Sequence, residues 1–157
     1  MKTHQILRQL LLQLPLVLTV AFSSSFAYAQ STAAGIAKIM IGDVRVVDAQ
    51  GERPLKSGDA IFENTRLVAG KQSSASLVLR DGTTLVLSEN SQINVEKFAY
   101  DATTQNGSIL VNLLQGSMRM LTGLIAKINP EAIQVKTKTL NVGIRGTDFI
   151  VETEDKP

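Results

Sequence analysis

The sequence predicts an all-β protein. Apolar runs of about four to seven residues recur roughly every ten to twelve residues, and glycine lies at most of the boundaries between them. No segment shows a convincing apolar repeat of 3.6 residues, which an amphipathic helix would require. Sandwiches, barrels and solenoids all share this local pattern, so periodicity alone leaves the arrangement of the strands open.

The first segment, residues 1–29, has the features of a secretory signal peptide. It carries Lys2 and Arg8 without any acidic residue, continues with the apolar run Leu10–Phe22, and ends in Ala-Tyr-Ala before Gln30. A basic start, an apolar centre and a small-residue end in this order are typical of a cleaved leader.

A retained membrane anchor is the alternative for this segment. The apolar run is about thirteen residues long and is interrupted by Gln13 and Pro15, whereas a spanning helix needs about twenty residues. We therefore expect cleavage, a mature domain of residues 30–157 without a membrane span, and a periplasmic or secreted location. A chain of that length is sufficient for one domain with its own core.

The mature chain begins with two predicted strands, Ile36–Ile41 and Val44–Val47. Both are rich in β-branched residues, and Gly42-Asp43 between them predicts a hairpin turn. The next segment, residues 49–58, is polar and contains glycine and proline, so we expect a loop there.

The clearest local prediction is a β-hairpin over Ala75–Leu87. Apolar and polar residues alternate on both sides of Asp81-Gly82, which is a favoured two-residue turn of type I′. A further strand is expected over Ser91–Val95, and Phe98 and Tyr100 continue its alternation on one face.

Two more strands are predicted on either side of Gly116. Ile109–Leu114 forms the first, the glycine is expected to break it, and Ser117–Leu121 forms the second. Met118 and Met120 share one face of that second strand. We expect them to fill the core, because a thioether metal site would need histidine or cysteine partners that are missing.

The last stretch predicts a half-buried strand, then a strand, a tight turn and another strand. Residues 133–139 alternate between an apolar and a basic face, and apolar runs at 140–144 and 149–151 then flank a charged turn. Arg145 and Asp148 are expected to hold this turn by bonding to the backbone or to each other. A recognition loop is the alternative interpretation.

Composition excludes several classes of function. The chain has 16 basic and 14 acidic residues, and loss of the leader with its two basic residues leaves 14 of each. A neutral surface without a basic cluster argues against nucleic-acid binding. The sequence has no cysteine, so disulfides cannot contribute to its stability.

We expect no catalytic residue, no cofactor site and no metal site. The single histidine, His4, lies in the leader, which excludes imidazole catalysis and histidine ligation in the mature chain. Asp59, Asp81, Asp101 and Asp148 all lie at predicted turns, where aspartate usually bonds to the local backbone. Calcium binding would need a run of acidic ligands at fixed offsets, which the sequence lacks.

Three segments, in order, resemble the motifs of the FecR family, which is named after a periplasmic regulator of iron-citrate uptake. They are L-K-S-G-D-A-I at 55–61, A-S-L-V-L-R-D-G-T-T-L-V-L at 75–87 and G-I-R-G-T-D-F at 143–149. The resemblance extends over roughly residues 37–151. Together with the similar segments L-V-A-G-K and L-L-Q-G-S, it favours short stacked strands in a solenoid-like or twisted sheet, with a β-sandwich as the alternative.

The resemblance implies a non-enzymatic sensing or adaptor module that binds another protein of the cell envelope. Full regulators of the family also carry a cytoplasmic anti-sigma segment and a transmembrane helix before this domain, whereas this chain begins with a predicted leader. Only the binding half of their function is therefore expected here. A structural or cell-wall glycan-binding envelope component is the alternative. Neither the identity of the partner nor the oligomeric state follows from the sequence.

Overall fold

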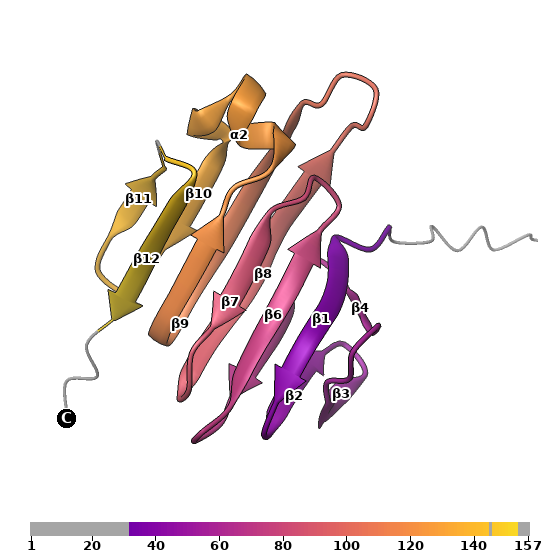
Figure 1. Cartoon of the computed structure of the whole chain (residues 1–157), viewed down its shortest axis with the longest axis vertical. Coiled ribbons are helices and arrows are strands. Elements are labelled where there is room, and N and C mark those ends of the chain that lie inside the picture. Colours follow the sequence, from indigo (N-terminus) through magenta and orange to yellow (C-terminus); the bar gives the residue numbers. More distant parts are fainter. Residues whose placement is uncertain (1–31, 145, 154–157) are drawn as a thin grey trace, which may run out of the picture. The chain divides into compact units, whose positions relative to one another are not determined.

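The protein folds as one strongly curled, mostly antiparallel β-sheet (Figure 1). The computed structural model describes residues 32–144 and 146–153, so the predicted signal peptide and Arg145 lie outside the described residues. The order of strands along the main path of the sheet is β3-β2-β5-β8-β9-β7-β6-β1-β4. The all-β prediction is confirmed, and of the arrangements left open the structure has the twisted sheet.

The described strands are short, apart from β8 and β9. Their bounds are β1 Gly35–Ile41, β2 Val44–Asp48, β3 Gly51–Pro54, β4 Ala60–Ile61, β5 Thr65–Ala69, β6 Ser74–Leu79, β7 Thr84–Leu87, β8 Ser91–Tyr100, β9 Gly107–Leu121, β10 Ile133–Lys136, β11 Asn141–Gly143 and β12 Asp148–Thr153. A short helix α2, Leu124–Ile128, and the 3-10 turn η1, Pro130–Ala132, follow β9.

Strand β9 organises the sheet because it pairs with four other strands. Its first half pairs with β8 on one edge and with β10, in parallel, on the other. Its second half pairs with β7 on one edge and with β12 on the other. The expected break at Gly116 is wrong, because the strand continues through this glycine with a φ of 77° and curls there. Ser91 supports the curl by accepting a hydrogen bond from the N–H of Ser117 (2.9 Å).

The core lies on the inner face of the curled sheet. Alternate residues of nearly every long strand point inward, as the period of two requires. Met118 and Met120 are fully buried, which confirms that they fill the core. Leu77, Leu85 and Leu113 are buried to the same degree.

The hairpin at 75–87 is confirmed as β6 and β7, but its predicted turn type is wrong. A type I′ turn needs a positive φ at both central residues. Gly82 has a φ of 85°, but the φ of Asp81 is not positive, so this turn type is not formed. The N–H of Gly82 bonds to the carbonyl of Leu79 (2.9 Å), and the N–H of Leu79 bonds to that of Thr83 (2.8 Å). The loop is thus longer than two residues, with glycine at its left-handed position.

Two predictions for the first part of the domain are wrong. Strands β1 and β2 exist, but they do not form a hairpin: β1 pairs with β6 and β4, whereas β2 pairs with β5 and β3. Gly42-Asp43 is a corner, and the N–H of Asp43 bonds to Ser73 Oγ across it (2.9 Å). Residues 51–54 form strand β3 instead of a loop. This strand lies at the edge of the sheet, where few apolar side chains are needed.

Two further differences lie after β9. The predicted strand over 133–139 ends at Lys136, because Thr137 begins a turn in which its N–H bonds to the carbonyl of Leu140 (2.8 Å). Helix α2 was not predicted. Its five residues bury Ile125, and a helix this short does not reveal a 3.6-residue period.

Candidate functional site

The turn Asp81-Gly82-Thr83 is a hydrogen-bonded unit in which Asp81 and Thr83 are buried. The Asp81 carboxylate accepts bonds from the N–H of Thr83 (3.0 Å) and from its hydroxyl (2.7 Å). Thr83 is fully buried, and Asp81 is 1% exposed. The same hydroxyl accepts a bond from the N–H of Gly123 (2.9 Å), and the carbonyl of Asp81 accepts one from the N–H of Leu124 (2.8 Å). The turn therefore anchors the start of α2.

The second motif turn, at 146–148, lies against the same segment. The N–H of Thr122 donates to the carbonyl of Thr147 (2.9 Å), and its hydroxyl donates to the carbonyl of Gly146 (3.1 Å). Thr122 and Gly123 thus connect two turns that lie far apart in the sequence. Sequence reasoning missed this role, because a threonine and a glycine between apolar runs carry no recognisable signal.

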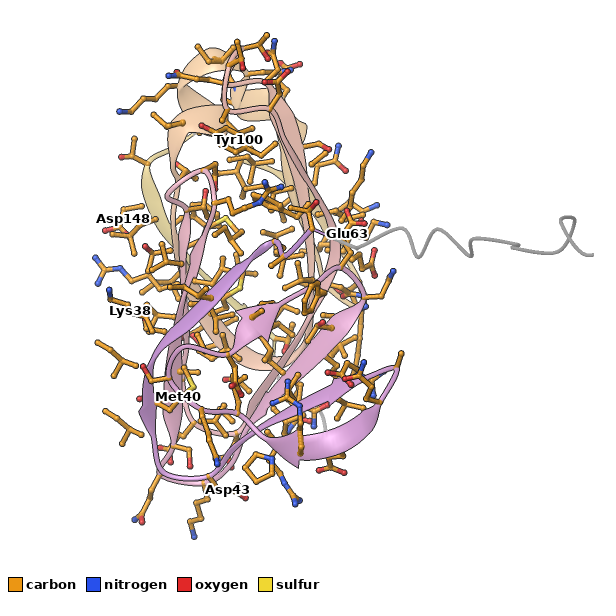
Figure 2. The ribbon with its side chains drawn as sticks, turned by 90° about the vertical axis from the view of Figure 1, so that its right-hand side faces the viewer. Lys38, Met40, Asp43, Glu63, Tyr100 and Asp148 are labelled. Atoms are coloured by element: carbon orange, nitrogen blue, oxygen red, sulfur yellow. The ribbon has the colours of Figure 1, made fainter. Side chains whose placement is uncertain are left out.

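Asp148 pairs with Arg119 of β9. The guanidinium Nε lies 2.8 Å from one carboxylate oxygen, and a terminal nitrogen bonds to the other. The Arg119 hydrogen bonds hold the pKa of the Asp148 carboxyl below its usual value of 3.8. The described bonds of Asp148 are therefore to a neighbouring strand, whereas its predicted partner Arg145 lies outside the described residues. Figure 2 labels Asp148 on the outer face.

Two hollows border the turn at 146–148, and Gly146 lines both. The first, here called the α2 pocket, has a volume of about 420 Å³ and lies between this turn and α2. Its lining combines apolar side chains with two threonines and one lysine. The lining residues are Thr122, Gly123, Ala126, Lys127, Pro130, Gly146 and Thr147.

The second hollow, here called the β11–β12 groove, is a more open space of about 510 Å³ along strands β11 and β12. Half-buried Val142, Phe149 and Val151 provide apolar walls, while Asp148 and Glu152 add carboxylates. The lining residues are Val142, Gly143, Ile144, Gly146, Asp148, Phe149, Ile150, Val151 and Glu152.

The outer edge of β12 is unpaired with respect to the described strands. β12 pairs with β9 on its other edge, where the bond from Thr122 to the carbonyl of Thr147 shows which residues face β9. Because peptide groups alternate along a strand, residues 149, 151 and 153 also face β9. Ile150 and Glu152 therefore direct their N–H and C=O groups toward the free edge.

Asp59 and Asp101 bond locally, as Asp81 does, whereas the expectation of a local bond is wrong for Asp148, whose described bonds are to Arg119. Asp59 accepts bonds from the N–H of Lys56 (3.0 Å) and from Arg53 (2.8 Å), and these two bonds, in that order, lower its pKa. Asp101 accepts bonds from the N–H groups of Thr103 (2.8 Å) and Thr104 (3.3 Å), which lower its pKa in the same way. These carboxylates hold turns together.

The described residues form neither a metal-binding cluster nor a membrane-spanning helix. Within residues 32–144 and 146–153, no three histidine, cysteine, aspartate or glutamate side chains gather closely enough to hold a metal ion. No helix in this part of the chain combines the length and apolar character needed to cross a membrane.

These features define an all-β module whose motif residues build turns beside an open strand edge. The sequence model of the FecR protein family matches residues 65–157, more than half of the chain, and the chain therefore belongs to the FecR family. The motif at 55–61 lies before the matched range. Domains of this family are typically found in the cell envelope and generally act in protein interactions.

A solved structure described as a cell surface anchoring domain is 33% identical to this chain, with a TM-score of 0.38. The match covers 40% of this chain and 84% of the chain of that structure. No curated protein matches the chain.

Proposed function

We propose that this chain is a non-enzymatic, exported sensing or adaptor module that holds an extended segment of another envelope protein in the β11–β12 groove. The free edge of β12 beside half-buried apolar side chains is the observation that carries this proposal. Peptides that add a strand to an open edge gain affinity from backbone hydrogen bonds and specificity from neighbouring pockets.

The composition of the groove supports a protein segment as its occupant. Phe149 and Val151 alternate with Ile150 and Glu152 along β12, so an added strand would meet an apolar side and a partly acidic side. Glu152 makes no ion pair with the described residues, which leaves its carboxylate available to a basic side chain of the partner.

A glycan-binding role has less support. Sugars are commonly held on exposed aromatic faces, and Phe98 is buried, while Tyr100 and Phe149 are half-buried. Phe62 is the most exposed aromatic side chain among the described residues, at 36%. No aromatic platform is therefore formed in the described part of the domain.

Site-specific photo-crosslinking in intact cells tests the location of the partner. One variant carries a photoreactive residue at Ile150, which lines the groove, and the control carries it at Ile128 of α2, which does not line the groove. The two positions are similarly exposed, at 63% and 53%. We expect an envelope protein to be captured from position 150 and not from position 128. Equal capture at both positions would contradict the proposal. If no protein is captured and the chain binds only to purified cell wall, the structural or glycan-binding alternative would be favoured.

A matched pair of variants then tests strand addition with the captured segment as a synthetic peptide. Glu152→Pro removes an N–H that points to the free edge, whereas Glu152→Gln removes the charge and keeps that N–H. An unsatisfied partner group costs about 1 to 3 kcal/mol, so the proline variant should bind roughly tenfold more weakly than the glutamine variant. Equal affinities would show that the peptide does not pair with β12.

A further inference from the structure

Strand β1 has an open edge along its second half, far from the β11–β12 groove in the order of the sheet (Figure 1). β4 pairs with the first two residues of β1, and the turn before β4 reaches the carbonyls of Ala37 and Lys38 through hydrogen bonds of 2.8 and 2.7 Å. Beyond Lys38, no described strand pairs with this edge as far as Ile41. Figure 2 views the molecule from this side and labels Lys38 and Met40.

The peptide group of Met40 points toward this open edge. The N–H of Leu79 in β6 bonds across the turn, on the side of β6 that faces β7. Because peptide groups alternate along a strand, the residues of β6 at odd-numbered distances from Leu79 direct their N–H and C=O groups toward β1. Ile39 and Ile41 lie opposite two such residues, which are serines. Met40 lies between them and therefore directs its N–H and C=O away from β6.

All three side chains along this open edge are apolar; Met40 is half-buried against the core, and the two isoleucines beside it are exposed. Ile39 and Ile41 are each 57% exposed and share the outer face of the sheet with Ile36, which is 45% exposed. Exposed apolar edge strands pair readily with other strands unless charge, proline or short length prevents it.

Two other described edges carry charge or proline. β12 has Asp148 and Glu152 on its outer face, and β3 ends in Pro54, whereas residues 39–41 of β1 include neither a charged residue nor a proline. An antiparallel pairing of β12 with itself, centred on Ile150, would place Asp148 opposite Glu152 twice. Like charges directly opposite each other are destabilising.

The edge of β1, in contrast, is self-complementary when it is paired with itself in the same antiparallel way. A two-fold axis at Met40 makes the two Met40 residues a pair whose N–H and C=O groups face each other. It places Ile39 opposite Ile41 of the partner subunit on the outer face, and Lys38 opposite Gly42 of the partner subunit. Apolar pairs therefore meet, and no like charges are opposed.

We propose that two copies of this chain associate through antiparallel pairing of their β1 edges around Met40, so that the sheet continues from one copy into the other. The pairing segment is short, so the dimer should be reversible and depend on concentration. The interface uses β1 and leaves the β11–β12 groove of each copy free, so the dimer does not depend on the proposed function.

Sedimentation velocity of the full exported chain at increasing concentration tests the dimer. We expect the average mass to rise from one chain toward two. Ile39→Glu combined with Ile41→Glu places carboxylates opposite each other across the axis and should keep the mass at one chain. Ile39→Lys combined with Ile41→Glu places opposite charges there and should restore association, which a misfolded variant would not do.

Ile150→Glu is the matched control, because it introduces the same charge at an exposed isoleucine at the other end of the sheet. It should associate like the wild type. A wild-type chain with the mass of one chain at every concentration would overturn the proposal. So would unchanged association of the double glutamate variant, failure of the opposite-charge variant to associate, or loss of the dimer in Ile150→Glu.

Discussion

Replacement of Thr83 by valine should destabilise the domain by removing one buried hydroxyl that bonds to two groups. Valine keeps the shape, but the Asp81 carboxylate loses a donor at 2.7 Å, and the N–H of Gly123 loses its acceptor at 2.9 Å. A hydrogen bond to a charged group contributes about 1.5 to 3 kcal/mol, and loss of the acceptor should cost the half-buried N–H of Gly123 about 1 kcal/mol, the low end of the range for an unsatisfied group. The added methyl group offsets about 0.8 kcal/mol of this loss.

The expected net decrease in the free energy of unfolding is therefore about 2 to 3 kcal/mol. With a urea dependence of about 2 kcal/mol per molar, the unfolding midpoint should fall by roughly 1 to 1.5 M. Urea titration followed by circular dichroism measures this shift. Thr84→Val is the control, because its hydroxyl bonds to none of the described residues, and it should change stability by less than about 0.5 kcal/mol. A midpoint for Thr83→Val equal to that of the control would refute the role assigned to the hydroxyl.

Three further predictions concern turns and charge. Gly82→Val should lower the unfolding midpoint more than Gly82→Asn, because φ is 85° at this position and asparagine tolerates the left-handed conformation better than a β-branched residue does; equal midpoints would contradict this. Gly123→Ala should destabilise severely, since its methyl group would collide with the backbone of the Asp81 turn, and an unchanged thermal midpoint would exclude that packing. The pKa of Asp148 is lower in the folded state than its usual 3.8, so its pairing with Arg119 stabilises the fold above that pH, and this contribution is lost as pH falls through the lowered pKa. The unfolding free energy of Asp148→Asn should therefore depend less on pH below about 4 than that of the wild type. Identical acid profiles of the two proteins would disprove this.

Local patterns predicted the elements better than they predicted the partners of those elements. The alternation over 75–87 gave the hairpin, because a period of two directly reports which side chains are buried. β1 and β2 are adjacent in sequence, yet each pairs with strands that lie further along the chain. No local signal specifies those pairings.

In the candidate site, too, the sequence predicted local elements but not the contacts between them. Its motif turns could be located from glycine and aspartate, but the contacts that join them could not. Asp148 bonds to Arg119, 29 positions earlier, and Thr83 bonds to Gly123, 40 positions later. The groove depends on the free edge of β12, which is defined only once β9 has been assigned to its other edge.

The late position of β9 in the chain has a consequence for how the protein folds. Strands β7 and β8 precede it in sequence, and both need it as a neighbour, so a chain that ends before residue 107 lacks the strand that joins the two halves of the sheet. Pairings between distant segments form slowly. We therefore expect the emerging chain to stay open until β9 is available, so that the two halves of the sheet join only after most of the domain has been synthesised.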